Sequence, residues 1–250
     1  YANTARKHVL PHLQYLRISE LSINRLSKWL NDLVRTNGLG RAKDARMALN
    51  LALNEAVYLE FIAVNPLDKV RPLPPLPRRE VRALTMPQLA EVREAMFEKK
   101  RREKAVGARA DDRLLCWFEV TVSNGARIGE VLALTREDVF LDEPNPFISI
   151  TKTLTRDKKG KYFIGNAPKT ASSVRVLPLS AEAVECLKLR ISKLNDLSPK
   201  ALILPTRYGT LWTPQPLRER LNRALEDAGL QHLEEHPHLL RKTVGTLVAA

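Results

Sequence analysis

The chain of 250 residues has few of the residues that build metal centres or covalent cross-links. With only two cysteines and five histidines, it is unsuited to a disulfide framework or a structural zinc site. Cys116 and Cys186 both fall in apolar stretches with helical spacing, which indicates buried reduced thiols and a cytoplasmic location. No run of about 18 apolar residues occurs, so we expect no membrane-spanning helix and no membrane partner.

Acidic clusters are also missing. The sequence has no compact group of Asp and Glu of the kind that two-metal phosphoryl transfer needs, so we expect neither a metal nor another cofactor. What the chain has in excess is positive charge: 41 Lys and Arg against 28 Asp and Glu give a formal net charge of +13 and a pI near 10.0. This excess predicts a polyanionic partner, with nucleic acid favoured over an anionic membrane surface.

The apolar pattern divides the chain into two domains. Helical spacing across residues 1–65, interrupted at Asn37-Gly38 and ended at Asn65-Pro66, predicts an all-helical first domain. Residues 66–84 contain five prolines and no helical period, which predicts a semi-extended basic linker. The linker is equally well interpreted as a solvated tether or as a strap along a phosphate backbone.

Residues 85–250 predict an α+β domain. Thr85-Met86-Pro87 has the composition of a helix N-terminus, and the charge-dense run 98–113 is expected to be a solvated helix end and loop. From residue 147 the pattern alternates and predicts three strands, near 147–154, 162–164 and 172–179, in one small antiparallel sheet. Helical spacing then resumes, so the fold class is mainly α: a helical N-terminal domain followed by an α+β domain.

One stretch of the second domain, residues 121–139, combines a turn with an isolated cation. Arg127 follows the turn signal Asn124-Gly125, which places it near a junction between two apolar helices. Glu130 lies three residues on, so on a helix it shares a face with Arg127 and can hold the guanidinium still. Taken alone, the pair is more simply interpreted as an ordinary surface ion pair.

Further basic groups occur in two other stretches. Lys169 sits in a predicted β-turn, and His238 and Arg241 are three residues apart at the start of the last helix, so they share a face. If these groups and Arg127 converge, they form an oxyanion clamp suited to a phosphodiester transition state without a metal. Lys could protonate a leaving oxygen, and His could donate or accept a proton. Lys152, on the first predicted strand, is the alternative for the lysine role.

Other basic residues are candidate contacts with a phosphate backbone. They are Arg41, Lys43 and Arg46, which open a helix after Gly40, together with Lys152 and Arg175 on the predicted strands. A solvated surface charge is the competing interpretation for each of them.

Three motifs, in this order and spacing, are similar to those of a known family: GARIGEVLALTREDV, PKTASSVRVLPL and HPHLLRKT. They resemble the tyrosine recombinase (phage integrase) family. Residues 4–65, with LPHLQYLRISELS and a helix ending AVNP, resemble the family's helical core-binding domain. The resemblance therefore covers nearly the whole chain and implies residues 1–65 as a core-binding domain, 66–84 as a linker and 85–250 as a catalytic domain.

The resemblance also implies a mechanism. Arg127 and Arg241 would be the two catalytic arginines, Glu130 the support of Arg127, Lys169 the proton donor to the leaving 5′ oxygen, and His238 the catalytic histidine. The family clamps double-stranded DNA, attacks the scissile phosphate with a tyrosine and forms a 3′-phosphotyrosine. Two rounds of strand exchange pass through a four-way junction on a homotetramer. DNA integration and recombination by a mobile element is the function implied.

The sequence departs from the family pattern near its end. The family's nucleophilic tyrosine follows the second arginine, whereas this chain ends at Ala250 and all five of its tyrosines precede His238. We therefore expect a fragment that binds DNA and activates a phosphate but does not cleave, with its nucleophile outside the sequence.

Two other functions fit the same residues. One is a non-catalytic DNA-binding module of the same fold, and the other is a type IB topoisomerase-like enzyme that acts without site specificity. The separate helical first domain and the proline-rich linker favour the recombinase. We expect a cytoplasmic protein that is associated with the nucleoid when bound to DNA.

Overall fold

The computed structural model describes residues 1–76, 83–105, 111–166, 174–233 and 238–249. The chain forms two compact units, Tyr1–Glu80 and Val81–Ala250, so their boundary falls inside the segment expected to link two domains. None of the helices in these described ranges is long and apolar enough to cross a membrane.

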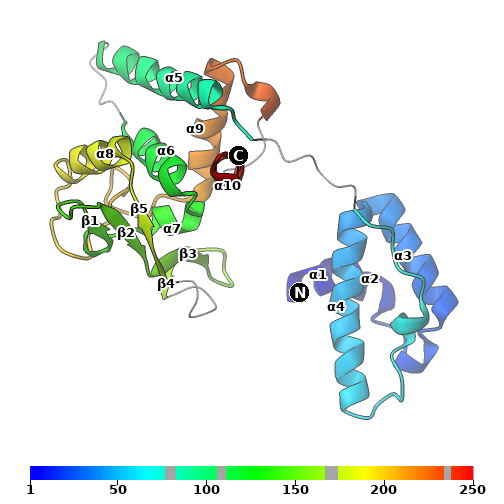
Figure 1. The fold of residues 1–250 in the computed structure, drawn as a ribbon. Helices are drawn as coiled ribbons and strands as arrows, with labels where there is room; N and C mark the ends of the chain where they lie inside the picture. The colour runs from blue at the N-terminus through cyan, green and yellow to red at the C-terminus, as the bar shows by residue number, and fades with distance from the viewer. Residues whose placement is uncertain (77–82, 106–110, 167–173, 234–237, 250) are drawn as a thin grey trace. The chain divides into compact units, whose positions relative to one another are not determined.

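The first unit is helical, as its apolar spacing predicts (Figure 1). Its first helical segment runs through α1 (Ala2–Thr4), the π-helical η1 (Ala5–Val9) and α2 (Leu10–Leu13). A 3₁₀ turn, η2 (Ile18–Glu20), leads to the long helices α3 (Ile23–Asn37) and α4 (Leu39–Tyr58), and a second 3₁₀ turn, η3 (Pro66–Lys69), follows them.

Local chemistry sets the ends of the two long helices. The Ser22 hydroxyl accepts a hydrogen bond from the Arg25 N–H (3.4 Å) and caps α3, and Gly38, with a φ of +84°, ends it. α4 ends at Tyr58, before the predicted stop at Asn65-Pro66, because Glu60 adopts a positive φ of 61°. The two helices bury one core between them, which includes Leu26, Leu30, Leu33, Ala42 and Ala45.

The beginning of the predicted linker is in fact packed against the first unit. The Asn65 side chain accepts a hydrogen bond from the Leu67 N–H (2.9 Å) and starts η3. Leu67 and Val70 are 1% and 3% exposed and belong to the core of this unit. The first unit therefore continues past residue 65, because these two apolar side chains find a buried position there. Residues 77–82 of the linker lie outside the described ranges.

The second unit mixes helices with short strands. Its helices are α5 (Met86–Ala105), α6 (Arg113–Asn124), α7 (Ile128–Leu132), α8 (Ala181–Ile191), α9 (Pro214–Asp227) and α10 (His238–Ala249), with 3₁₀ turns η4 (Arg136–Asp138) and η6 (Gln231–Leu233). Its strands are β1 (Val139–Phe140), β2 (Phe147–Ile150), β3 (Lys152–Arg156), β4 (Tyr162–Asn166) and β5 (Arg175–Pro178).

The strands form two sheets in the described ranges, where the sequence predicted one. β1, β2 and β5 make an antiparallel sheet, and β3 and β4 make a separate hairpin. The predicted strand 147–154 is broken at Thr151, whose hydroxyl donates to the Asp138 carboxylate (3.0 Å) between β2 and β3. As a result β5 pairs with β2, with Ile148 opposite Leu177, and not with the preceding strand β4.

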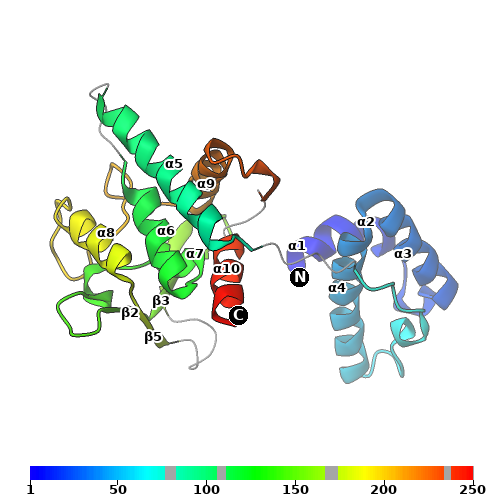
Figure 2. The same cartoon turned by 45° about the horizontal axis from the view of Figure 1, so that its top comes forward.

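Helix α6 is the centre of the second unit. Trp117 and Phe118 are 0% exposed, and the helix packs against α7, α8 and α10, as Figure 2 shows. Thr243 of α10 is also buried, and its hydroxyl accepts a hydrogen bond from the Leu84 N–H (2.9 Å). These contacts fix the C-terminal end of α6 and the first turns of α10 within one core.

The charged run 98–113 begins as a helix end, as predicted, with residues 98–102 exposed or partly exposed and α5 continuing to Ala105. Asp112 is an exception: it is 5% exposed and forms ion pairs with Arg190 of α8 (3.1 Å) and with Lys193, two residues after that helix. Its partners come from distant parts of the chain, so a local charge pattern does not reveal its burial.

Candidate active site

The candidate site begins at the turn between α6 and α7. Gly125 adopts the left-handed conformation, with a φ of +68°, and ends α6. The Asn124 side chain accepts a hydrogen bond from the Ala126 N–H (3.0 Å) and fixes the same turn. A Cβ at Gly125 would lie 3.4 Å from Val244 of α10, which is an ordinary van der Waals contact, so the left-handed φ is what favours glycine here. Arg127 follows directly as the N-cap residue of α7.

Glu130 holds Arg127, as the spacing predicts. Its carboxylate accepts hydrogen bonds from the Arg127 backbone N–H (2.8 Å) and from Arg127 Nη1 (2.9 Å). The Glu130 side chain is 2% exposed, whereas that of Arg127 is 53% exposed. The carboxylate is thus an internal anchor, and the guanidinium it anchors faces solvent.

Arg175, the first residue of β5, binds the same carboxylate. Its Nη1 and Nη2 donate to Glu130 Oε1 (3.1 Å) and Oε2 (2.8 Å). Burial raises the pKa of Glu130, but the hydrogen bonds from Arg175 and Arg127 outweigh it and lower the pKa below its ordinary value. The sequence predicted Arg175 as a DNA contact, and the structure instead directs its guanidinium fork at Glu130.

Arg241 of α10 lies next to this group. Its Nη1 donates to the Gly125 carbonyl oxygen (2.8 Å), two residues before Arg127. Burial, together with the positive charges of Arg127 and Arg175, lowers the pKa of Arg241. Arg127, Arg175 and Arg241 therefore form one arginine cluster around Glu130. Three positive charges meet one negative charge, which favours the binding of an additional anion.

The other two predicted catalytic residues are placed differently. His238 is the first residue of α10, is exposed, and lies one helical turn before Arg241 on the same face. Lys169 lies outside the described ranges. The structure thus brings Arg127, Glu130 and Arg241 together and puts His238 on the helix face that carries Arg241.

Lys152 has a structural environment. Its Nζ lies 2.6 Å from Thr135 Oγ1, 2.6 Å from Glu137 Oε1 and 3.0 Å from Asp138 Oδ2. An ammonium group has three hydrogen atoms to donate, and these three oxygens can take all of them. Burial lowers the pKa of Lys152, but the hydrogen bonds with Glu137 and Asp138 outweigh it and raise the pKa. Neither expectation for Lys152, as the alternative catalytic lysine or as a DNA contact, fits this arrangement.

The basic residues of the first unit also separate into two kinds. Arg46 donates to the carbonyl oxygens of Arg71 (3.0 Å), Leu67 (3.1 Å) and Val70 (3.1 Å), so it holds the start of the linker instead of facing a ligand as predicted. Arg41 is exposed and Lys43 partly exposed on α4, and as DNA contacts they stay predictions.

Sequence reasoning missed the structural role of Arg175 and the contact of Arg241 with Gly125. The alternation of β5 contained a signal for the first of these. Arg175 and Leu177 are two residues apart on a strand and share its half-buried face, where an arginine needs an acidic partner. The Arg241 contact joins α10 to the turn after α6 and leaves no comparable trace in the local sequence.

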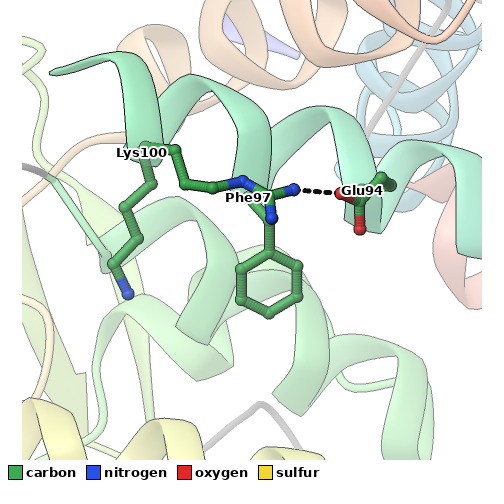
Figure 3. A pocket seen from close by; sticks show the side chains of 4 residues that line it. Glu94, Phe97 and Lys100 are labelled. Carbon is green, nitrogen blue, oxygen red and sulfur yellow. Dashed lines mark hydrogen bonds and ion pairs between the residues drawn. The ribbon is translucent and has the colours of Figure 1, made fainter. Parts of the chain in front are cut away.

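A hollow elsewhere on the second unit is unrelated to the arginine cluster. It is open to solvent and lined by Glu94, Phe97, Lys100 and Arg101, which all belong to α5 (Figure 3). Arg101 forms an ion pair with Glu94 across it. The hollow contains none of the candidate site residues.

Comparison with known proteins identifies similar chains. The profile of the phage integrase family matches residues 90–249. A protein of Lactococcus lactis subsp. lactis (strain IL1403), described as a prophage ps2 probable integrase, is 29% identical over 206 residues. That match covers 78% of this chain and 51% of the relative, so the chain spans about half the length of this curated protein.

Solved structures share the fold. A structure of the Tn1549 transposon integrase in complex with circular intermediate DNA superposes with a TM-score of 0.76 at 19% identity, over 99% of this chain and 80% of that one. A lambda integrase tetramer bound to a Holliday junction gives a TM-score of 0.67 at 17% identity, over 98% and 66% of the two chains. These similarities confirm the predicted fold class, mainly α with small antiparallel sheets.

Proposed function

The chain belongs to the phage integrase family, and we propose that the protein is a site-specific DNA recombinase that breaks and rejoins strands through a 3′-phosphotyrosine. One observation carries the proposal: Arg127 and Arg241, from distant parts of the sequence, meet at the Gly125 turn. A carboxylate fixes one of them and a backbone carbonyl fixes the other. Two guanidinium groups held in this way suit the oxygens of a single phosphate.

The proposed chemistry assigns one role to each group. Arg127 and Arg241 bind the two non-bridging oxygens and stabilise the charge that builds on them in the transition state. The tyrosine oxygen forms a bond to phosphorus while the bond to the 5′ oxygen breaks. Lys169 gives a proton to that 5′ oxygen as it leaves, and His238 accepts the proton that the tyrosine hydroxyl loses. Rejoining reverses these steps with the 5′ hydroxyl of a partner strand as the attacking group.

No tyrosine of this sequence is proposed as the nucleophile. Tyr1, Tyr15 and Tyr58 belong to the first unit and are 73%, 88% and 80% exposed. In the second unit, Tyr162 stacks under Arg156 (5.3 Å) and Tyr208 under Arg207 (4.6 Å). Neither arginine belongs to the cluster around Glu130. The residue that attacks is left to be identified by experiment.

The first unit and the assembly complete the proposal. We infer that the helical unit, with Arg41 and Lys43 on α4, binds the duplex as a core-binding domain, while the second unit provides catalysis. The net charge of +13 supports a polyanionic partner. The lambda integrase tetramer bound to a Holliday junction, which has the same fold, supports a homotetramer that exchanges strands through a four-way junction. The proposed location is the cytoplasm, on chromosomal or mobile-element DNA.

The test is covalent trapping. Duplexes bound by the full-length natural protein are selected from a random library, and a nick is introduced beside the scissile position so that the cleaved product cannot religate. The proposal predicts a covalent protein–DNA adduct on the selected site, and peptide mapping of that adduct identifies the attacking tyrosine. Arg127→Ala and Arg241→Ala should each slow adduct formation by at least about 10²-fold.

Each competing function predicts a different result. Tight, sequence-specific binding without any adduct would identify a non-catalytic DNA-binding module. Relaxation of supercoiled plasmids that lack the selected site would identify a type IB topoisomerase-like activity.

A further inference from the structure

Glu130 has no acceptor capacity left over. A carboxylate offers about four lone-pair positions, two on each oxygen. Oε1 accepts from Arg127 Nη1 (2.9 Å) and Arg175 Nη1 (3.1 Å), and Oε2 accepts from the Arg127 backbone N–H (2.8 Å) and Arg175 Nη2 (2.8 Å). Each oxygen therefore receives one hydrogen bond from each arginine residue.

This sharing determines how Arg127 can bind Glu130. With Arg175 present, the Arg127 side chain donates one hydrogen bond to the carboxylate, through Nη1, and this side chain is 53% exposed. Without Arg175, two acceptor positions on a 2% exposed carboxylate would be unfilled. A fork from Arg127 is the nearest way to fill them, since guanidinium and carboxylate groups match bidentately.

We propose that Arg175 is a positioning residue for phosphate activation: it occupies the inner acceptor positions of Glu130 and so keeps the Arg127 guanidinium turned outward to bind the scissile phosphate. This inference rests on the proposed recombinase function. Arg175 does not touch the phosphate itself. Its effect passes through Glu130 to Arg127, and its charge also adds to the positive environment of Arg241.

The chain offers a matched control at another buried glutamate. Arg93 of α5 forks onto Glu119 of α6, with Nε–Oε1 at 2.6 Å and Nη2–Oε2 at 2.9 Å. The side-chain exposures of this pair, 32% and 3%, are close to the 27% and 2% of Arg175 and Glu130. Within the described ranges, no second arginine donates a hydrogen bond to Glu119. Substitution of Arg93 therefore measures the structural cost of losing such a fork, without an effect on Arg127.

The first test reads the arginine side chains directly and needs no catalysis. The guanidinium Nε–H resonances of Arg127 and Arg241 are assigned by NMR in the full-length protein and compared with those in Arg175→Lys, Arg175→Gln, Arg93→Lys and Arg93→Gln. The proposal predicts that the Nε–H resonance of Arg127 shifts in both Arg175 variants and is unchanged in both Arg93 variants. An unchanged Arg127 resonance in a folded Arg175 variant would overturn it.

The second test measures the rate of covalent adduct formation. An Arg175→Lys change keeps the charge but removes the fork, and we expect adduct formation about 10–100-fold slower, the usual effect of losing a partner that orients a reactive group. Arg93→Lys should leave the rate within about twofold. A methylphosphonate at the scissile position carries no negative charge, so its cleavage depends less on the placement of the arginines. On this substrate the difference in adduct rate between Arg175→Lys and the wild type should therefore be smaller.

The two proposals fail in different ways. If the wild-type protein forms no adduct on its selected site, the proposed function fails, and the NMR comparison still decides the role of Arg175. If the wild type forms the adduct and Arg175→Lys is as fast as Arg93→Lys, the recombinase function stands and the positioning role is rejected. If Arg175→Lys is slowed equally on the phosphate and the methylphosphonate substrates, the positioning role is also rejected, because a general loss of structure would slow the two reactions alike.

Discussion

Glu119 and Glu130 are two buried glutamates of the same domain, each bound by the fork of an arginine. Their side-chain exposures are nearly the same, and the two hydrogen bonds of each fork are 2.6 and 2.9 Å at Glu119 and 3.1 and 2.8 Å at Glu130. The two glutamates differ in the other groups that bind to each carboxylate. Glu119 joins α5 to α6, and within the part of the chain that the structure describes Arg93 is the one arginine that donates to it. Glu130 also binds Arg127, whose side chain is 53% exposed.

The difference teaches how a structural ion pair becomes part of a candidate site. A buried Arg–Glu pair contributes little net stability by itself, because desolvation offsets the attraction. When a second arginine is fixed by the same carboxylate and faces solvent, the anchor also orients a cation toward a ligand. In the proposed site, the neighbouring Arg241, held at Gly125, is the second guanidinium of the clamp.

The largest expected effect separates the arginines of the two regions. If the proposed mechanism holds, Arg127→Ala or Arg241→Ala removes a donor to the transition state and should slow adduct formation by about 10²–10³-fold or more. Arg93→Ala should leave the rate within an order of magnitude of wild type, because Arg93 lies at the other glutamate. The measurement is adduct yield against time on a nicked duplex. A similar loss in all three variants would remove the distinction between the two regions.

The second prediction concerns the glutamates themselves. Glu130→Gln leaves two arginines and one backbone N–H without their charged acceptor, whereas Glu119→Gln affects one arginine. Breaking a fully buried pair costs about 3–5 kcal/mol, and the partial exposure of these arginines should reduce the cost to about 2–3 kcal/mol at Glu130. Glu119→Gln should cost less.

Urea unfolding followed by tryptophan fluorescence checks this order. Trp117 and Trp212 report on the second unit, and a Trp29→Phe background removes the signal of the first. A larger loss of unfolding free energy in Glu119→Gln than in Glu130→Gln would contradict the account of Glu130 as the more heavily bonded anchor.

A third prediction tests the link that only the Glu130 region has with α10. Gly125→Ala forces a side chain into a left-handed conformation, at a cost of about 1 kcal/mol, and brings a Cβ to 3.4 Å from Val244. Gly209, with a φ of +76° and no atom within 4 Å of its added Cβ, is the matched control. Both variants should lose similar stability, but only Gly125→Ala should slow the adduct, several-fold, because it displaces the carbonyl that holds Arg241.

The smallest expected effect is a dependence of stability on pH. The pKa of Glu130 is lowered in the folded protein from its ordinary value of 4.5. Its ionised form therefore stabilises the fold fully above about pH 4.5, and this contribution is lost as the pH falls through the lower, folded pKa. Each pKa unit of displacement corresponds to about 1.4 kcal/mol.

The matching measurement is the free energy of unfolding from pH 6 to pH 3. The wild type should lose more stability over this range than Glu130→Gln, which has no carboxylate to protonate at that position. Parallel curves for the two proteins would mean that the Glu130 carboxylate is not stabilised by its arginines.

Local sequence patterns predicted much of the fold. Helical spacing predicted the helical first unit with its break at Asn37-Gly38, Thr85-Met86-Pro87 predicted the start of α5, and the Asn124-Gly125 turn placed Arg127 between two helices. The three-residue spacing of Arg127 and Glu130 predicted their ion pair. Each of these features depends on residues within a few positions of each other, so the sequence contains the relevant information directly.

Features that depend on distant partners were predicted less well. The split of the sheet at Thr151 depends on Asp138, and the packing of Leu67 and Val70 depends on the core of the first unit. Arg46, Lys152 and Arg175 were predicted as surface contacts, although carbonyls and carboxylates elsewhere in the chain engage them. A basic side chain looks the same in sequence whether it faces a ligand or a buried acceptor.

The most direct test of the account is a crystal structure of the full-length protein with its selected, nicked duplex and orthovanadate, which mimics the phosphorus at the transition state. We predict that Arg127 and Arg241 both donate to oxygens of the same vanadate, while Arg175 remains forked on Glu130. A structure in which the two arginines bind different groups, or in which Arg175 leaves Glu130 to bind the vanadate, would contradict the account.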